Sequence, residues 1–316
     1  MWTLFDGISS KPYVATAKAL KDGTHTPWSA PRLLPTVNST AGDTYLLPHV
    51  DPAGVVYTTV TNFPAKHGFC CSTISVDYST DGGNTWQGPR VVIQNIQDPP
   101  LIYANTTFRD GIEDTFAVGN QQSAQGHYPL YVAWEDYSAG VGNNILSASY
   151  DQGLTWSAPI QVNDNASAVD EFQPNLTVAA DGTVSVAFYD RRLSCPKAGT
   201  AEAAGAGLAL DKVNPNYSGS LPPYGATNYC INASVQFYSA TLTPFGNNIR
   251  LTQHTWDPQL NAPHPGSASG TETFIGDYFG NTTSGSINIS SFVSTYNDGL
   301  NPQYQQQQVV ATVAVP

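Results

Sequence analysis

The sequence is poor in charge and has no basic cluster. Only 11% of its 316 residues are charged, and 12 Lys and Arg residues stand against 24 Asp and Glu residues, so the formal net charge is −12. Proteins that bind nucleic acids neutralise phosphates with clustered Lys and Arg, so we expect no nucleic-acid partner. No apolar run is long enough to cross a bilayer as a helix, and we expect no membrane span.

Amphipathic helical patterns are also missing. The best helical candidate, residues 199–212, is interpreted as an insertion. The 27 Gly, 23 Pro and 17 Tyr residues instead suit many short strands joined by tight turns. Composition therefore predicts an all-β protein.

Cysteine and lysine are scarce. Cys195 and Cys230 bracket a Gly-, Pro- and Ala-rich stretch, and we predict a disulfide between them. The adjacent Cys70 and Cys71 are compatible with a strained vicinal disulfide or with two buried thiols. Neither set has zinc-site spacing with histidine, so no zinc site is expected. We expect no cofactor, with calcium as the one alternative. Scarce lysine and eight Asn-x-Ser/Thr sequons favour a secreted, extracellular protein.

One short pattern, Ser-x-Asp-x-Gly-x-Thr-Trp, occurs twice. The Asp carboxylate can accept hydrogen bonds from free backbone N–H groups of a tight turn, and Gly can take its positive-φ position. Thr and Trp then enter the next strand. Both copies continue as Trp-x-x-Pro into an apolar run, which indicates a structural repeat. The residues are Ser79, Asp81, Gly83, Thr85 and Trp86 in the first copy and Ser149, Asp151, Gly153, Thr155 and Trp156 in the second.

This pattern resembles the Asp box, or BNR repeat, of the sialidase superfamily. The resemblance implies a β-propeller of four-stranded antiparallel blades, in which the boxes join third and fourth strands away from the catalytic face. The boxes are therefore expected to be architectural. A degenerate third copy at residues 22–28 has the same Trp-Ser-Ala-Pro exit as the second.

Strand signals divide the chain into blades of one propeller domain, residues 1–316. Residues 1–35 supply only the later strands of a blade, and the last blade has three strands, expected at 272–279, 287–296 and 307–316. We therefore expect a six-bladed sialidase-type propeller truncated at its N-terminus; the alternative is a ring that closes with fewer blades. The expected units are a partial blade at 1–38 and four recognisable blades at 43–94, 108–163, 170–253 and 270–316.

Propeller geometry places the starts of first strands and the ends of second strands on the face opposite the boxes. Many ionisable residues of this charge-poor chain fall at these positions, which predicts a rim that binds a polar ligand. The rim residues are Arg109, Asp110, Glu113, Glu135, Asp136, Tyr137, Asp170, Glu171, Tyr189, Asp190, Arg191, Arg192, Glu272, Tyr296 and Asp298, with Lys66 and His67 in a further loop.

The resemblance assigns chemistry to this rim. In sialidases three arginines bind the substrate carboxylate, a Tyr paired with a Glu is the nucleophile, and an Asp is the acid/base. Arg191 and Arg192 are adjacent, so on a continuing strand only one of them would face the pocket. The candidates for substrate binding are Arg109, Arg191, Arg192, Glu113 and Glu135. The candidates for catalysis are Asp110, Asp277, Tyr278, Tyr189 and Glu171.

The segment 108–114 is the densest charged cluster, and three interpretations stay open for it. It could supply catalytic carboxylates, oxygen ligands for calcium, or a salt-bridged entrance to a blade.

For the whole chain, we favour a sialidase-like exo-glycosidase that hydrolyses a terminal acidic sugar from glycoconjugates. Its partner would be a carbohydrate or glycoprotein, and we expect a monomer. The absence of the family's Arg-Ile-Pro motif favours a non-catalytic carbohydrate- or protein-binding propeller instead. A polysaccharide lyase on the same scaffold, with His67 or a Tyr as base, is the third possibility.

Overall fold

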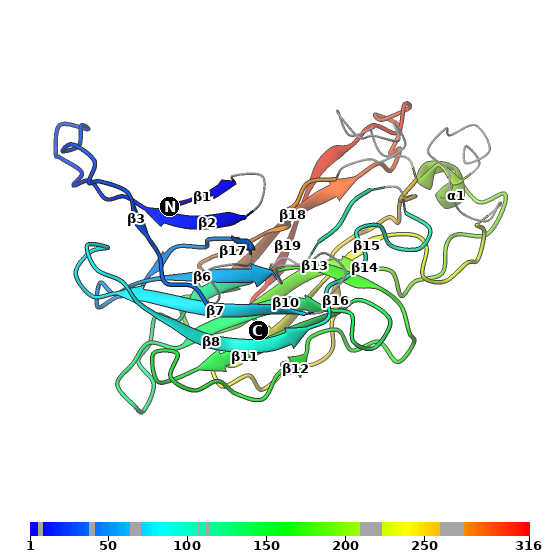
Figure 1. The fold of residues 1–316 in the computed structure, drawn as a ribbon. Coiled ribbons are helices and arrows are strands. Elements are labelled where there is room, and N and C mark those ends of the chain that lie inside the picture. Colours follow the sequence, from blue (N-terminus) through cyan, green and yellow to red (C-terminus); the bar gives the residue numbers. More distant parts are fainter. Residues whose placement is uncertain are drawn as a thin grey trace. The chain divides into compact units, whose positions relative to one another are not determined.

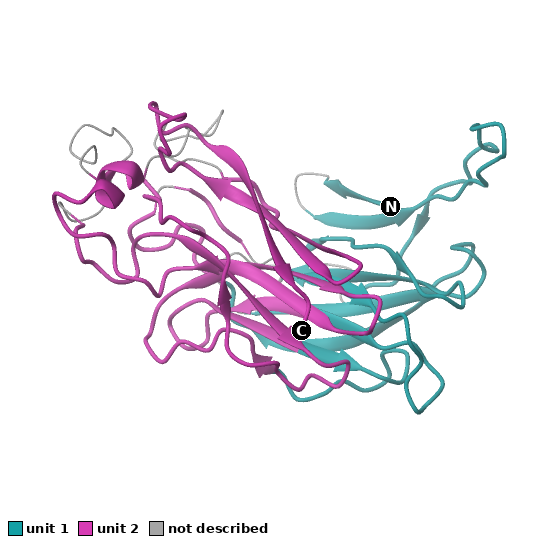
Figure 2. Cartoon of the chain, turned by 180° about the vertical axis from the view of Figure 1, so that it is seen from behind, with its two compact units in different colours: residues 1–98, 114–132, 147–159 teal, residues 99–113, 133–146, 160–316 magenta. Residues whose placement is uncertain are grey.

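The computed structural model describes residues 1–5, 9–37, 42–63, 71–106, 108–111, 114–208, 223–259 and 275–316. The chain forms two compact units, which are coloured separately in Figure 2. Within the described residues, no helix has the length and apolar character needed to cross a membrane. Unit 1 comprises Met1–Asp98, Asp114–Val132 and Ser147–Pro159, and unit 2 comprises Pro99–Glu113, Ala133–Leu146 and Ile160–Pro316.

Two antiparallel sheets lie in the described part of unit 1 (Figure 1). In the larger sheet β6 pairs with β7 and β7 with β8, while β4 and β5 both pair with β6. Tyr45 at φ +54° lies in the left-handed region between β4 and β5, so the first strand is split. The strands are β1 (Trp2–Phe5), β2 (Ser10–Val14) and β3 (Arg32–Leu33) in one sheet, and β4 (Gly42–Thr44), β5 (His49–Val50), β6 (Val56–Phe63), β7 (Ser72–Ser79) and β8 (Gln87–Ile96) in the other.

A four-stranded sheet follows, in the order β12-β11-β10-β9. The boundary between the two units falls within β10 and β11 in the sequence. The strands are β9 (Thr115–Val118), β10 (Leu130–Asp136), β11 (Asn143–Ser149) and β12 (Ile160–Gln161).

Unit 2 contains the remaining two sheets of the described residues. One has four strands in the order β13-β14-β15-β16, the other three in the order β17-β18-β19, and β17 lies against β13. Aromatic side chains from both sheets form the core of the unit, among them Phe172, Tyr189, Phe279 and Phe292. The strands are β13 (Glu171–Val178), β14 (Val184–Asp190), β15 (Asn232–Tyr238), β16 (Ile249–Arg250), β17 (Gly280–Ser284), β18 (Ile287–Ser294) and β19 (Gln307–Ala314).

Apart from the split first strand of the larger sheet in unit 1, consecutive strands pair in antiparallel meanders, and such sheets are the blades of a β-propeller. The predicted fold class, all-β with four-stranded antiparallel blades, is confirmed. The number of blades in a closed ring and the single-domain organisation stay predictions.

The two Ser-x-Asp-x-Gly-x-Thr-Trp copies form the same turn, one between β7 and β8 and the other between β11 and β12. In the first copy the Asp81 carboxylate accepts hydrogen bonds from the Thr85 amide at 2.8 Å and from the Ser79 hydroxyl at 2.8 Å. The Gly83 amide, at φ +86°, donates to the same hydroxyl oxygen at 2.8 Å. The equivalent bonds in the second copy measure 2.9, 2.8 and 2.8 Å. The predicted turn is therefore confirmed in both copies.

The start of the last blade differs from the prediction. Residues 272–274 of the expected strand 272–279 lie outside the described residues, and residues 275–279 are not a strand. Gly276 has φ +99°, a left-handed conformation that ends extended structure, and β17 begins only at Gly280. Asp277 and Tyr278 therefore lie on a loop, and the expectation that they belong to the strand 272–279 is wrong.

The predicted disulfide is present: Cys195 and Cys230 are bonded across a sequence separation of 35 residues. The stretch that they bracket contains the helix α1 (Ala201–Ala206), which begins after Thr200 as its N-cap. Cys71 is disulfide-bonded, whereas Cys70 lies outside the described residues.

Candidate functional site

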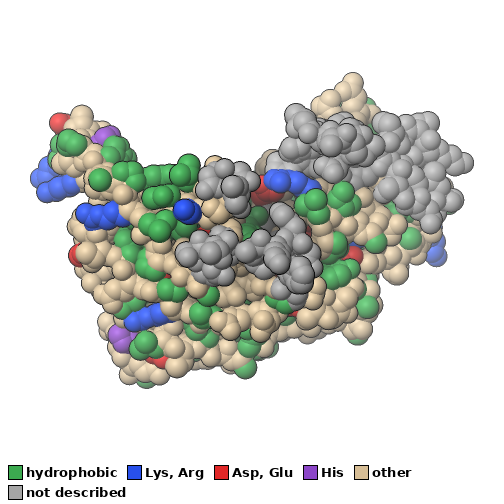
Figure 3. All heavy atoms as spheres, in the orientation of Figure 1, with side chains coloured by type: hydrophobic (Ala, Val, Ile, Leu, Met, Phe, Trp, Pro, Cys, Tyr) green, Lys and Arg blue, Asp and Glu red, His purple; other side chains and the backbone are tan. Residues whose placement is uncertain are grey.

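Strand order brings several rim residues of unit 2, and the catalytic candidate Asp277, to one end of its sheets. In an antiparallel meander the first strand starts at the same end at which the second strand finishes. Asp170 and Asp277 therefore precede the first strands β13 and β17 at this end, and Arg191 and Tyr296 follow the second strands β14 and β18. Charged side chains are few on the face drawn in Figure 3, in agreement with the low charge of the sequence.

Arg109 and Asp277 form a two-pronged contact although they are 168 residues apart in sequence. The Arg109 Nη2 atom lies 2.9 Å from Asp277 Oδ2 and 3.1 Å from Oδ1. Their side chains are 43% and 31% exposed, so the pair is open to solvent. An exposed guanidinium beside a carboxylate can exchange that partner for the anionic group of a ligand.

Asp110 lies next to this pair and is buried. Its backbone N–H donates to the Leu101 carbonyl at 2.7 Å, and its Oδ1 atom accepts from Gln173 Nε2 at 3.2 Å. Burial raises the pKa of Asp110 to about 7, against the lowering effect of the Gln173 hydrogen bond, and the charge of Asp277 raises it further. Asp110 therefore exchanges a proton near neutral pH.

Gln173 joins Asp110 to the loop that carries Asp277, and it was not among the predicted site residues. Its Nε2 atom donates to Asp110 and, at 3.1 Å, to the Gly276 carbonyl oxygen. The residue lies at φ +48° where the register of β13 and β14 shifts, so its side chain leaves the regular alternation. A polar residue directly before Pro174 on a core strand was the available signal.

Glu135 belongs to the interior beneath this cluster. It is fully buried, and burial raises its pKa well above the usual range. Its Oε2 atom accepts a hydrogen bond from the backbone N–H of Gln173 at 3.4 Å. A Cβ atom on Gly142 would lie 2.5 Å from the Tyr103 hydroxyl and 3.1 Å from Glu135 Oε1, so both polar groups face this glycine. Glu135 supports the site from inside and does not reach solvent.

Arg191 is fully buried, and all its guanidinium nitrogens donate hydrogen bonds within the protein. Nη1 pairs with Asp170 Oδ2 at 3.1 Å, and Nε donates to the Tyr229 carbonyl at 3.1 Å. Nη2 donates to the carbonyls of Ala104 at 2.9 Å and Asn228 at 2.6 Å. Arg191 therefore ties loops of unit 2 together and is not available to a ligand.

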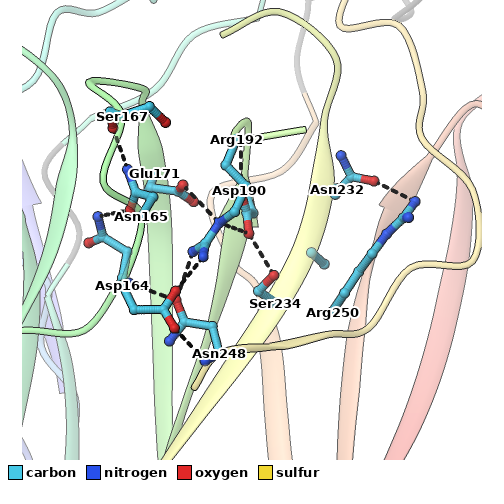
Figure 4. Close-up of polar contacts among 12 residues, drawn as sticks. Asp164, Asn165, Ser167, Glu171, Asp190, Arg192, Asn232, Ser234, Asn248 and Arg250 are labelled. Carbon is cyan, nitrogen blue, oxygen red and sulfur yellow. Dashed lines mark hydrogen bonds and ion pairs between the residues drawn. The ribbon is translucent and has the colours of Figure 1, made fainter. Parts of the chain in front are cut away.

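Arg192 is also engaged, in the network drawn in Figure 4. Its Nε atom lies 2.7 Å from Asp190 Oδ2 and 3.6 Å from Glu171 Oε1, and its Nη1 atom pairs with Asp164. Its Nη2 atom donates to Asn248 Oδ1 at 2.7 Å. Glu171 is fully buried here, and burial followed by the charge of Asp190 raises its pKa well above the usual range. These contacts hold Arg192 within the protein, so its guanidinium is not available to a ligand.

The two candidate nucleophiles differ in exposure. Tyr189 is buried in the aromatic core, stacked on Phe172 with ring centroids 5.2 Å apart, and its hydroxyl accepts the Val293 amide at 2.9 Å. Tyr278 is 73% exposed and follows Asp277 directly. We therefore leave Tyr189 out of the proposed site and keep Tyr278.

Some candidates lie outside the described residues, namely Lys66, His67, Glu113 and Glu272. In the part of the chain that the structure describes, no group of three or more His, Cys, Asp or Glu side chains could hold a metal ion. The calcium alternative for segment 108–114 rests partly on undescribed residues and stays open.

No family model and no curated protein matches the chain. Among solved structures, the α-L-arabinofuranosidase Arb93A from Fusarium graminearum in complex with an iminosugar inhibitor is 12% identical with a TM-score of 0.42. The match covers 79% of this chain and 56% of that enzyme. A polysaccharide lyase of family PL25, an ulvan lyase, is 9% identical with a TM-score of 0.35, over 90% of this chain and 59% of the lyase.

The sialidase NanB from Streptococcus pneumoniae, as a point mutant, is 12% identical with a TM-score of 0.40. The match covers 95% of this chain but only 35% of NanB. At these values no function is transferred from any of the three proteins. The chain is similar to parts of carbohydrate-active enzymes, and its activity has to be argued from its own side chains.

Proposed function

We propose that the chain is a glycoside hydrolase that removes a terminal acidic sugar, with Asp110 as general acid beside the Arg109–Asp277 ion pair. The observation that carries the proposal is the buried Asp110 carboxyl, whose pKa is raised to about 7. A general acid is most effective when its pKa lies near the working pH, and glycosidases commonly raise a carboxyl pKa by burial for this purpose.

The acidic sugar would bind through Arg109, the most exposed of the three candidate arginines. Its carboxylate would compete with Asp277 for the guanidinium. Because Asp110 is buried, groups around it must move to admit the substrate, and we propose that competition for Arg109 favours this movement. Gln173 would keep the Asp110 carboxyl oriented while the loop moves.

Tyr278 is the proposed nucleophile, with Asp277 as the carboxylate that accepts its proton after Arg109 turns to the substrate. The exposure of Tyr278 and its place beside Asp277 support this assignment. Asp110 would protonate the leaving-group oxygen in the first step and, once ionised, activate water in the second.

A non-catalytic sugar-binding propeller is the second candidate, and one observation favours it. Arg191 and Arg192 are engaged by partners within the protein, so the three-arginine clamp expected from the sequence is reduced to Arg109. A single exposed guanidinium is enough to recognise an anion but gives a weaker, less directional contact than three.

The test is release of 4-methylumbelliferone from its sialic acid, glucuronic acid and arabinofuranose glycosides. Turnover of an acidic glycoside that is lost in Asp110→Asn and Asp277→Asn, and weakened in Arg109→Ala, is the expected result. Asp181→Asn is the matched control, since Asp181 is exposed and its carboxylate accepts the Thr183 amide of its own turn. Binding of acidic sugars without turnover of any glycoside would favour the second candidate.

A further inference from the structure

A second polar cluster in unit 2 is not used by the proposed mechanism. The Glu202 carboxylate, on α1, accepts hydrogen bonds from three directions. Its Oε2 atom accepts the Tyr296 hydroxyl at 3.0 Å and lies 2.9 Å from His254 Nδ1, and its Oε1 atom accepts the Thr255 amide at 3.1 Å. The partners come from the loops after β16 and β18, so the contact joins three separate segments.

The cluster fixes two aromatic rings face to face. The rings of His254 and Tyr296 are stacked with centroids 4.0 Å apart and an interplanar angle of 7°. Gly205 of α1 lies directly against Tyr296, because a Cβ atom there would come within 2.4 Å of the tyrosine Cζ. The Asn297 amide donates to the Gly205 carbonyl at 2.8 Å and holds the helix in this position. Both rings are therefore held rigidly before any ligand arrives.

These rings border a cavity of about 460 Å³. Its lining includes apolar residues such as Phe292 and Val309 and uncharged polar residues such as Gln253 and Ser294. The His254 side chain lines the cavity and is 44% exposed, so one ring of the stacked pair is accessible to solvent. An aromatic ring, apolar side chains and uncharged hydrogen-bonding groups together suit a sugar ring, which presents both C–H groups and hydroxyls.

The charge of the cavity sets the class of sugar. Asp298 lines it, and among the residues that line it there is no Lys or Arg. An anionic sugar would meet the Asp298 carboxylate with no Lys or Arg among the lining residues, whereas Arg109 supplies a positive group at the site proposed for catalysis. The two sites therefore differ in the charge that they accept.

We propose that this cavity is a separate binding site for a neutral saccharide unit, held against the His254–Tyr296 pair. The site is independent of the proposed catalytic function, because it shares no residue with the Arg109–Asp110–Asp277 cluster. A glycan that carries one acidic terminal sugar and neutral internal sugars would offer a group to each site.

The test is saturation-transfer NMR with maltotriose, xylotriose, lactose and, as charged probes, glucuronic acid and choline. At least one neutral saccharide should bind the wild-type chain, whereas glucuronic acid and choline should show no transfer that depends on the cavity. His254→Ala removes the exposed ring of the stacked pair, and Thr312→Trp adds bulk at an exposed lining position on β19. Each should weaken saccharide binding about tenfold or more, which equals about 1.4 kcal/mol.

The matched control is His127→Ala, at an exposed histidine of unit 1, which should bind as the wild type does. Asp110→Asn should also retain binding, and this separates the cavity from the proposed catalytic site. Absence of binding by all three neutral saccharides would overturn the inference. So would binding that survives both cavity substitutions, or a preference for glucuronic acid or choline that both substitutions abolish.

Discussion

Replacement of Asp110 by Asn should stabilise the protein at alkaline pH. The pKa of this carboxyl is raised from 3.8 to about 7 by burial, so the folded chain keeps a proton that the unfolded chain releases. The stability that this proton provides is complete below about pH 4 and is lost as the pH rises through about 7. The two pKa values differ by about three, and at about 1.4 kcal/mol for each pKa unit the loss amounts to about 4 kcal/mol.

The asparagine side chain of this variant has no proton to lose and nearly the same shape as the aspartic acid, and its oxygen can still accept the Gln173 hydrogen bond. Urea unfolding of both proteins at about pH 4 and about pH 9 measures the effect. Between these two conditions the wild type should lose about 4 kcal/mol more of its free energy of unfolding than the variant does. Parallel pH dependence of the two proteins would refute the reasoning.

Asp22 provides the control of opposite sign. Its carboxyl is exposed, and hydrogen bonds from Thr24 lower its pKa. The ionised group therefore stabilises the folded chain above about pH 4, and this contribution is lost as the pH falls below its ordinary pKa. Asp22→Asn should weaken the protein slightly at neutral pH and should not reproduce the alkaline stabilisation expected of Asp110→Asn.

Three further predictions concern stability. Arg191→Met should lower the free energy of unfolding by about 3–5 kcal/mol in urea titrations, because Asp170 would keep a buried charge without its partner; an unchanged midpoint would contradict the buried ion pair. Ser79→Ala should cost about 1–2 kcal/mol, since the Gly83 amide loses its acceptor in the turn, and calorimetry should show a lower Tm. Cys195→Ser should cost about 3–4 kcal/mol, because the bond closes a loop of 35 residues in the unfolded chain; a variant as stable as the wild type would show that the cross-link is unimportant.

Much of the fold could be predicted from local sequence. Strands such as β6 and β14 are runs of β-branched, aromatic and small residues with high strand propensity, and the two repeated turns carry their own hydrogen-bonding groups within eight residues. The start of β17 could not be located, because the conformation of Gly276 depends on contacts such as the Gln173 hydrogen bond to its carbonyl. That bond joins residues 103 positions apart.

The candidate site was predictable in position more than in role. Topology alone placed Arg109 and Asp110 on the rim, whereas Asp277 was expected on a strand; the structure brings the three together. The same topology could not show that the Arg191 guanidinium donates its hydrogen bonds to backbone carbonyls of distant loops, nor that Tyr189 packs in the aromatic core. Those outcomes depend on which long-range partner reaches each side chain, and a rim position in the sequence does not specify that.

The role of Asp110 as general acid is tested most directly by the pH dependence of kcat/KM on an acidic 4-methylumbelliferyl glycoside. We predict activity that falls as the pH rises through about 7, because the Asp110 carboxyl must carry the proton that it donates. We also predict that Asp110→Asn removes this activity while the purified variant stays folded. Activity that is retained by Asp110→Asn with an unchanged pH profile would contradict the central claim.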